Sequence, residues 1–474
     1  IMSEIKVNKI SPRTACGTTT LGDSGDTFNL PSGATLTVAS GATITNNGTQ
    51  TGFGREGSVN WQTGSIKTTT FTAASGEGYF VNSGSALTMN LPAGSAGAIV
   101  AVSDYARNFA TYNLTVSPNG SEKIGGQAED AKLDIDGQAA TFVYVDSTKG
   151  WINVQNAEDT ETGIPPYIGA TGGTEATCGN FKTHIFTGPG TFTVSRTAVC
   201  AADNVVDYLV VAGGGGGSGA SGPGAGGRGG GGAGGGRTFQ STPTTNPIKA
   251  PAGVTVTATG YTITVGGGGT AGPPSGNGGK GNDSTFSTIT STGGGYGANH
   301  PASGGPGGSG GGTFSTDTGG TGNDPPVAPP QGHPAVPVPS APSGGTGGGG
   351  LGASPPGSAP INAGTAGGAG SYVPDAFIGP TAPSYGEGSG PVANARYFAG
   401  GGGGGGYNAG GGAGGIGGGG CGVNSYGPGG AGDPAIPGTI NTGGGGGSVG
   451  AAGPGGTNGG AGGSGIVMIR YRFQ

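Results

Sequence analysis

Apolar and polar residues alternate along much of this chain, and Gly, Asn, Asp and Ser occupy the joints between the alternating runs. A period of two places successive side chains on opposite faces of a strand, so the pattern predicts β-structure. No stretch of about 11 residues carries apolar positions at helical spacing. We therefore expect an all-β chain in which short strands are separated by turns.

The clearest block of alternating strands is 55–157, which predicts a β-sandwich or jelly-roll-like domain. Turn signals such as Pro118-Asn-Gly120 divide it. The expected strands are 66–72, 79–82, 87–91, 99–103, 114–117, 141–146 and 151–155. The aromatic residues expected to supply its core are Trp61, Phe80, Tyr105, Phe142, Tyr144 and Trp151.

An eight-residue repeat precedes this block. Ser32-Gly-Ala-Thr35 recurs as Ser40-Gly-Ala-Thr43, and the flanking apolar positions keep the same spacing. A unit of one strand and one turn cannot bury its apolar face alone, whereas three chains wound around one axis can. We expect 28–54 to form the β-shaft of a homotrimer and 1–27 to dock on a partner. A flexible linker is the alternative for the repeat.

The composition changes after residue 211, where glycine becomes the dominant residue. It supplies 122 of the 474 residues, in runs such as 213–217 and 400–406. A chain without side chains either stays disordered or packs backbone against backbone as polyproline II helices, with Gly at the crowded positions. Strand-like segments at 205–212 and 466–473 lead into and out of this region. We expect these two to pair, which makes 181–474 one glycine-rich polyproline II domain.

Smaller features complete the organisation of the chain. Strands at 181–186 and 191–194 straddle a tight turn and predict a hairpin, and 254–258 with 261–265 predict an internal strand pair. The polar, proline-containing residues 158–180 are expected to be a linker. The longer Pro/Gly/Ser stretch from 323 to 363 is expected to be an exposed loop, where binding specificity usually resides.

The cysteines offer little chemistry. Cys16, Cys178, Cys200 and Cys421 are too few and too scattered for a disulfide framework, and no Cys/His spacing indicates zinc. Cys178 and Cys200 flank the predicted hairpin. A disulfide between them and two separate thiols both remain open.

Charge and hydropathy argue against several classes of protein. Charged residues are 9% of the chain and the net charge is −6. Arg228 and Arg237 amid glycine are too few for an RNA-binding segment in so acidic a chain, so we expect no nucleic-acid partner. No apolar run approaches the ~18 residues of a membrane span, and the first residues lack the apolar stretch of a signal peptide. We expect neither membrane insertion nor a cleavable leader.

Catalysis has equally little support. Gly-x-Gly-x-x-Gly recurs, but the composition alone produces it and no copy has a strand–loop–helix context. The carboxylates of Glu129, Asp130, Asp134 and Asp136 would suit glycoside hydrolysis or Ca²⁺, although Asp/Gly turns are the commoner explanation. His184 alternates within a strand and is expected to be structural. We expect no enzyme, no metal and no cofactor.

Particular motifs resemble a known kind of protein. Met2-Ser-Glu-Ile-Lys-Val-Asn-Lys-Ile10 and Thr43-Ile-Thr-Asn-Asn-Gly-Thr-Gln-Thr-Gly-Phe-Gly54 resemble the opening of structural fibre proteins of tailed phages of aquatic bacteria, cyanobacteria in particular. Three segments, 206–217, 261–267 and Gly465-Ile-Val-Met-Ile-Arg-Tyr471, resemble the glycine-rich domain at phage fibre tips. In the distal adhesins of T-even phages, related tracts pack as a layered polyproline II sandwich whose tip loops contact the host receptor.

The resemblance implies a trimeric tail fibre of the virion. Residues 1–27 would be a virion-attachment segment that binds other virion proteins, and the glycine-rich adhesin would bind a host cell-surface polysaccharide or outer-membrane component. Aromatic and amide side chains suit a glycan, which offers flat apolar faces and hydrogen-bonding groups. The receptor-binding candidates interrupt the glycine runs: Tyr296, Asn299, His300, Tyr372, Tyr385, Tyr397, Phe398, Tyr407 and Tyr426.

Two other classes remain open. A purely structural virion appendage, such as a neck, whisker or capsid-decorating fibre, would use the same shaft and glycine-rich domain without binding a receptor. An ice- or surface-binding protein built on polyproline II helices would need a flat face of small residues. The scattered aromatic residues and prolines argue against that third reading.

Overall fold

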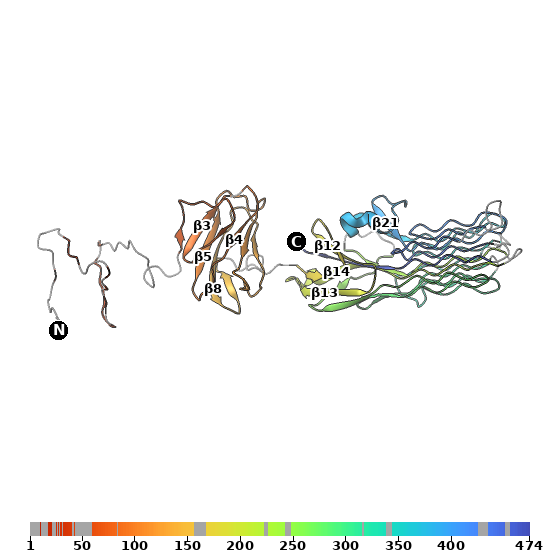
Figure 1. Ribbon diagram of the computed structural model, residues 1–474, viewed down its shortest axis with the longest axis horizontal. Helices are drawn as coiled ribbons and strands as arrows, with labels where there is room; N and C mark the ends of the chain where they lie inside the picture. The colour runs from red at the N-terminus through yellow and green to blue at the C-terminus, as the bar shows by residue number, and fades with distance from the viewer. Residues whose placement is uncertain are drawn as a thin grey trace. The chain divides into compact units, whose positions relative to one another are not determined.

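The computed structural model describes residues 59–82, 84–155, 167–221, 226–241, 248–314, 317–337, 344–424, 435–450 and 456–474, with scattered residues between 10 and 42. The chain divides into two units, Ile1–Ser58 and Val59–Gln474. The predicted attachment segment and shaft lie mostly outside the described residues. The second unit is nearly all β (Figure 1). Among the described residues there is no helix with the length and apolar character that a membrane span requires.

A β-sandwich forms the first part of the second unit. Its first sheet has the order β1 (Asn60–Trp61), β3 (Glu77–Val81), β5 (Ile99–Asp104), β8 (Ala139–Asp146) and β9 (Gly150–Asn153). Its second sheet has the order β2 (Phe71–Thr72), β4 (Leu87–Asn90), β6 (Leu114–Ser117) and β7 (Ala131–Leu133). The chain alternates between the sheets from β1 to β6, so β3 pairs with β5, and β4 with β6, in parallel. This pairing differs from the antiparallel strands of a jelly roll.

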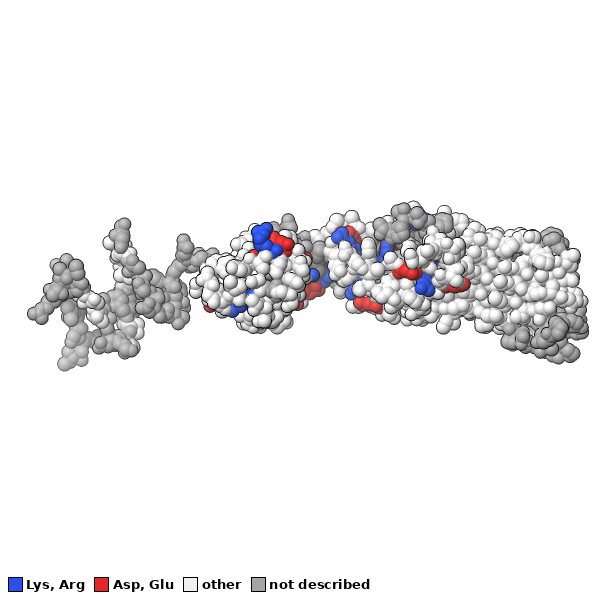
Figure 2. Space-filling view, turned by 90° about the horizontal axis from the view of Figure 1, so that it is seen from above, with Lys and Arg blue, Asp and Glu red and all other residues white. Residues whose placement is uncertain are grey.

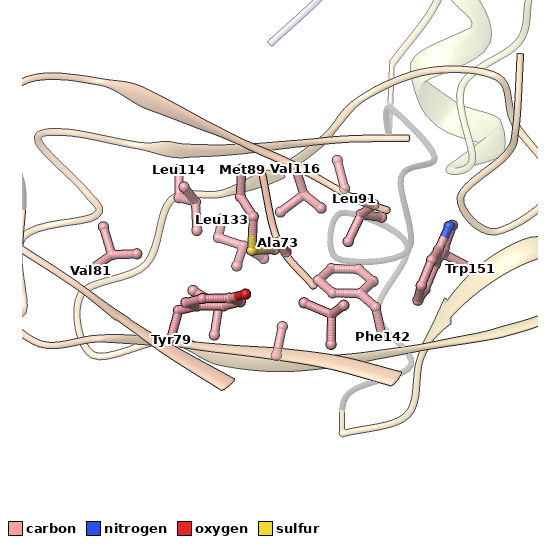
Figure 3. Close-up of a cluster of buried hydrophobic side chains, with 14 of the residues drawn as sticks. Ala73, Tyr79, Val81, Met89, Leu91, Leu114, Val116, Leu133, Phe142 and Trp151 are labelled. Atoms are coloured by element: carbon pink, nitrogen blue, oxygen red, sulfur yellow. The ribbon is translucent and has the colours of Figure 1, made fainter. Parts of the chain in front are cut away.

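The core of the sandwich lies between its two sheets (Figure 3). Met89, Phe142 and Trp151 are fully buried there. The predicted core aromatics Trp61 and Tyr105 are instead exposed, and Phe80 packs against both of them rather than in the core. The sequence prediction is wrong for these three because alternation shows which residues share a face, not which face is covered.

The glycine-rich domain begins with two further sheets. The first has the order β11 (Thr174–Cys178), β12 (Phe181–Phe186), β22 (Ile466–Arg472), β14 (Val205–Val211) and β15 (Gly236–Phe239). The short strand β16 (Val254–Thr255) also pairs with β14. Because β14 and β22 pair antiparallel, the predicted closure of the glycine-rich region by its first and last strands is confirmed.

This first sheet is buried on both faces. Val467 and Ile469 of β22 contact the second sheet, which has the order β10 (Gly169–Thr171), β13 (Gly190–Arg196), β17 (Gly260–Thr264), β18 (Ser284–Phe286) and β19 (Ile289–Ser291). Ile466 and Met468 face the opposite cluster, which includes residues of β20 (Ser371–Pro374), α1 (Asp375–Ile378), the 3₁₀ segment Gly379–Ser384 and β21 (Ala395–Phe398). A second 3₁₀ segment, Ala201–Asn204, leads into β14. Burial of both faces explains the unbroken apolar runs of β14 and β22.

Several local predictions are wrong. Strands β10 and β11 fall within the predicted linker 158–180, where Gly172 and Gly173 have φ of +116° and +65° and supply the turn between them. Strands β12 and β13 lie in different sheets and so do not form the predicted hairpin. Segment 254–255 pairs with β14 and not with β17. Local alternation predicted strands here, but the pairing of each strand depends on distant segments.

Of the two alternatives for Cys178 and Cys200, the structure shows free thiols.

After β14 the chain enters a lattice of extended glycine-rich segments. Every third N–H group from Gly213 donates to one neighbouring segment: Gly213 to Asn282, Gly216 to Gly279 and Gly219 to Gly276, at 3.0, 2.9 and 3.1 Å. The intervening groups donate in turn to two other segments: Gly214, Gly217 and Ala220 to Gly463, Gly460 and Thr457, and Gly215 and Ser218 to Gly232 and Gly229. A period of three is that of a polyproline II helix. The sideways bonds satisfy the buried backbone groups.

Crowding explains the glycine. A Cβ atom placed on Gly231 would lie 2.0 Å from the carbonyl oxygen of Gly215, and one on Gly215 would lie 2.1 Å from that of Gly295. Real Cβ atoms do not approach backbone below 3.0 Å. The lattice also includes part of the stretch predicted as an exposed loop, because Gln331 is 1% exposed and the His333 N–H donates to the Gly350 carbonyl at 3.1 Å.

Candidate functional site: the free end of the glycine lattice

The lattice has two ends. At one end its segments continue into the strands around β12 and β14, and at the other, here called the free end, they reverse in turns (Figure 1). Four of these turns are closed by an N–H group that donates to the carbonyl three residues earlier: Gly276 to Pro273, Ala302 to Asn299, Asp317 to Phe314 and Ala363 to Pro360. Side chains reappear at these turns because the crowded packing ends there.

Amide side chains join two of the turns. The Asn277 Oδ1 accepts the backbone N–H of Asn299 at 2.8 Å, and the Asn299 Nδ2 donates to the Ser275 carbonyl at 2.6 Å. The Ser275 and Ser221 hydroxyls also bond to each other. Asn299 Oδ1 is buried and has no hydrogen-bond partner among the described residues. The candidate Asn299 therefore lies at the free end and has a role in holding it together.

His300 links a third turn to this group. Its side chain is 51% exposed, and its Nδ1 lies 2.9 Å from Asp317 Oδ2. Its ring centroid lies 4.9 Å from that of Phe314. An exposed imidazole, a carboxylate and an aromatic ring thus stand beside the amide pair. Sequence reasoning found Asn299 and His300 but missed the residues of the facing turns, for which Pro273-Pro-Ser-Gly-Asn-Gly278 was the available turn signal.

Two candidate tyrosines belong to the lattice. Tyr296 is half-buried and its ring covers Gly305, where an added Cβ would lie 2.4 Å from the ring. Tyr407 is half-buried at another reversal, and its backbone N–H donates to the Asn362 carbonyl at 2.7 Å. Both residues keep part of their surface in solvent.

Four other candidates lie at the strand end. Tyr397 and Phe398 belong to β21 and are 4% and 1% exposed, which removes them as contact residues. The ring of Tyr372 on β20 packs against that of Tyr397 at a tilt, with centroids 5.4 Å apart, and Tyr385 packs against the cluster that contains Phe398. These islands interrupt the glycine runs because they cover the central sheet. Tyr426 lies outside the described residues.

The lattice is poor in charge (Figure 2). The charged residues of 265–370 are Lys280, Asp283, Asp317 and Asp324. Among the described residues, no group of three or more His, Cys, Asp and Glu is placed to hold a metal ion, and Asp136 of the acidic cluster accepts the Ala110 N–H at 2.8 Å. The free end thus offers amide, hydroxyl and aromatic groups, together with the imidazole and carboxylate of His300 and Asp317.

Arg228 is an exception inside the lattice. It is buried, its Nη1 donates to the Gly226 carbonyl at 2.6 Å, and its Nε has no partner among the described residues. Burial lowers the pKa of its guanidinium. Such a buried cation does not resemble the exposed arginines of an RNA-binding segment.

Comparison with known families agrees with this architecture. The profile of the glycine-rich domain family matches residues 186–472, which include the central strands, the lattice and the free end. The chain belongs to the glycine-rich domain family. The match begins at the end of β12 and stops at the end of β22, so the glycine-rich domain covers most of the strands that close the lattice. No curated protein sequence matches the chain.

Proposed function

We propose that this chain is a receptor-binding fibre protein of a phage virion, and that the free end of its glycine lattice recognises a glycan on the host surface. The main observation behind this proposal is that the turns at the free end have exposed side chains, whereas the packed segments of the lattice are mostly glycine. Asn277, Asn299, His300 and Phe314 come together there from three successive turns of the chain.

The chemistry of this end suits a neutral polysaccharide. Amide and hydroxyl groups exchange hydrogen bonds with sugar hydroxyls, and aromatic rings pack against the apolar faces of sugar rings. The lattice holds these turns in place without a helix or a conventional core. In a homotrimer, as the eight-residue repeat predicts, weak contacts at each free end would combine through multivalency into strong adsorption.

The two ends of the lattice provide a matched pair of variants. Ile361, at a free-end turn, and Ile440, at a reversal near Ala399, are 70% and 71% exposed. Fluorescently labelled full-length chain is applied to aquatic bacterial strains, cyanobacteria included, and to their purified polysaccharides. We expect saturable binding that Ile361→Glu or His300→Ala weakens and that Ile440→Glu leaves unchanged.

The outcomes test where the receptor contact lies and whether the chain binds a receptor or is a purely structural appendage. Equal binding by the Ile361 and Ile440 variants would place the contact away from the free end. No saturable binding by a folded, assembled chain to a strain that its phage infects would favour the purely structural appendage.

A further inference from the structure

The β-sandwich has two outward faces of opposite character. In its second sheet, strands β4 and β6 turn Thr88, Asn90, Thr115 and Ser117 away from the core, and all four are polar. An antiparallel or mixed sheet exposed to water on one side normally shows this pattern of apolar residues inside and polar residues outside. The second sheet is therefore built to face solvent.

The first sheet does not follow this pattern. Its inward residues Val100, Phe142 and Trp151 form the core, so the residues that alternate with them point outward. We call the outward set the outer face. It comprises Trp61, Gly78, Phe80, Ile99, Ala101, Ser103, Ala139, Thr141, Val143 and Ile152.

Register aligns the outer face into apolar rows. Ile99 lies opposite Val143, and Val143 lies opposite Ile152, so one row crosses β5, β8 and β9. At the other edge, the Trp61 ring lies over Gly78, where an added Cβ would lie 2.8 Å from ring carbons. Ile99, Val143 and Ile152 are each partly exposed, so this row is an apolar strip where a solvated sheet would carry polar side chains. Ala101, between the row and Trp61, is 1% exposed and adds little surface.

The aromatic residues extend this surface at one side. The ring centroids of Trp61 and Phe80 are 4.9 Å apart, and those of Phe80 and Tyr105 are 6.4 Å apart. Trp61 is 38% exposed and Tyr105 is 57% exposed. Exposed aromatic residues that join an apolar sheet face are typical of a surface that another molecule covers.

We propose that copies of this chain associate through the outer face of the first sheet of the sandwich. The outer face contains no charged residue, so copies of the chain can bury it against one another without desolvating a charge. The unit Ile1–Ser58 also exposes apolar side chains that association would bury. Leu30, Leu36 and Val38 are 42%, 62% and 41% exposed. This inference does not depend on the receptor-binding function.

Self-association fits the outer face better than a sugar does. A glycan platform places hydrogen-bonding groups around its aromatic residues, whereas the apolar row of Ile99, Val143 and Ile152 crosses this face. Five strands about 4.8 Å apart, with about four residues each, give a footprint of about 24 Å by 13 Å. This is below the ~800 Å² per partner of a standard interface, so this contact alone is expected to be weak and concentration-dependent.

Tryptophan fluorescence reports on this face directly. The chain contains two tryptophans, Trp61 and Trp151, and Trp151 is 0% exposed. Quenching by acrylamide therefore reads the accessibility of Trp61. For the full-length chain, we expect sedimentation velocity to show assembly and quenching to fall as protein concentration rises.

Paired variants complete the test. Val143→Glu and Thr141→Lys place a charge on the outer face, and Thr115→Glu places one on the solvated second sheet. We expect the first two to restore quenching of Trp61 at high concentration and Thr115→Glu to behave as wild type. Thr141→Lys removes no apolar side chain, so it retains the test if Val143→Glu fails to fold. A single-copy chain at every concentration, quenching that never falls on assembly, or quenching lost only on addition of a polysaccharide would each overturn the proposal.

Discussion

Replacement of Gly231 by alanine tests the physical basis of the lattice. Gly231 donates its N–H to Gly446 at 2.8 Å and accepts the Gly402 N–H at 2.9 Å. The new methyl carbon would lie 2.0 Å from the Gly215 carbonyl oxygen, so one segment must move. Because backbone stands on both sides of the clash, no flexible side chain can absorb it.

The cost follows from this geometry. Overpacking typically costs about 1–3 kcal/mol, and weakening the two backbone hydrogen bonds adds about 0.5–1.5 kcal/mol each. The lower chain entropy of unfolded alanine returns about 0.4–1 kcal/mol. We expect Gly231→Ala to lower the free energy of unfolding of the glycine-rich domain by about 1–5.5 kcal/mol.

A matched control lies in the same lattice. Gly267 is exposed, and a Cβ there would meet only Asn282 Nδ2 at 3.6 Å. Gly267→Ala is therefore expected to be neutral or stabilising by up to about 1 kcal/mol. Differential scanning calorimetry of the full-length chain should show a lower Tm for the lattice transition in Gly231→Ala alone. Equal Tm values for the two variants would refute the argument that crowding requires glycine.

Three further predictions concern the strands that close the lattice. His184 is buried, with Nδ1 2.7 Å from the Gly172 carbonyl and Nε2 3.1 Å from the Tyr471 hydroxyl. Burial lowers the pKa of His184, so the imidazole binds a proton at higher pH in the unfolded chain than in the folded one. The free energy of unfolding should therefore decrease below about pH 6.5, by at most about 1.4 kcal/mol per pH unit. Denaturation of His184→Gln across pH 5–8 should show a flatter dependence of stability on pH. Asp207→Ala should destabilise the domain by about 3–5 kcal/mol in chemical denaturation, because it leaves the buried Arg470 guanidinium, whose Nε lies 3.0 Å from Asp207 Oδ2, without its carboxylate. Deletion of 466–474 should make the domain sensitive to limited proteolysis throughout, since β22 pairs with both β12 and β14; a protected lattice in that variant would contradict the closure argument.

In the sandwich, alternation of apolar and polar residues predicted the strands but not which residues form the core. Strands β4, β5 and β6 are close to their predicted ranges because alternation is a local property. Their aromatic character predicts core positions for Trp61 and Phe80, yet both lie on the outer face. Which of two faces is buried depends on where the other sheet packs, and no short stretch of sequence contains that information.

The candidate site shows the same division. Asn299 and His300 were recognisable because they interrupt glycine runs next to a proline. Tyr397 and Phe398 interrupt runs in the same way but are buried beside the central sheet. An interruption therefore marks the end of a segment without showing which end of the lattice it occupies.

Composition and local pattern were enough to predict an all-β chain, a backbone-packed glycine region and the pairing of its first and last strands, because each follows from which side chains are present at neighbouring positions. The tertiary structure alone decided that Asn277 meets Asn299, that His300 meets Asp317, and that the first sheet of the sandwich leaves an apolar face uncovered. These features join residues from separate turns and strands. Their positions depend on how the whole lattice and both sheets pack, since neither glycine nor strand alternation specifies its partner.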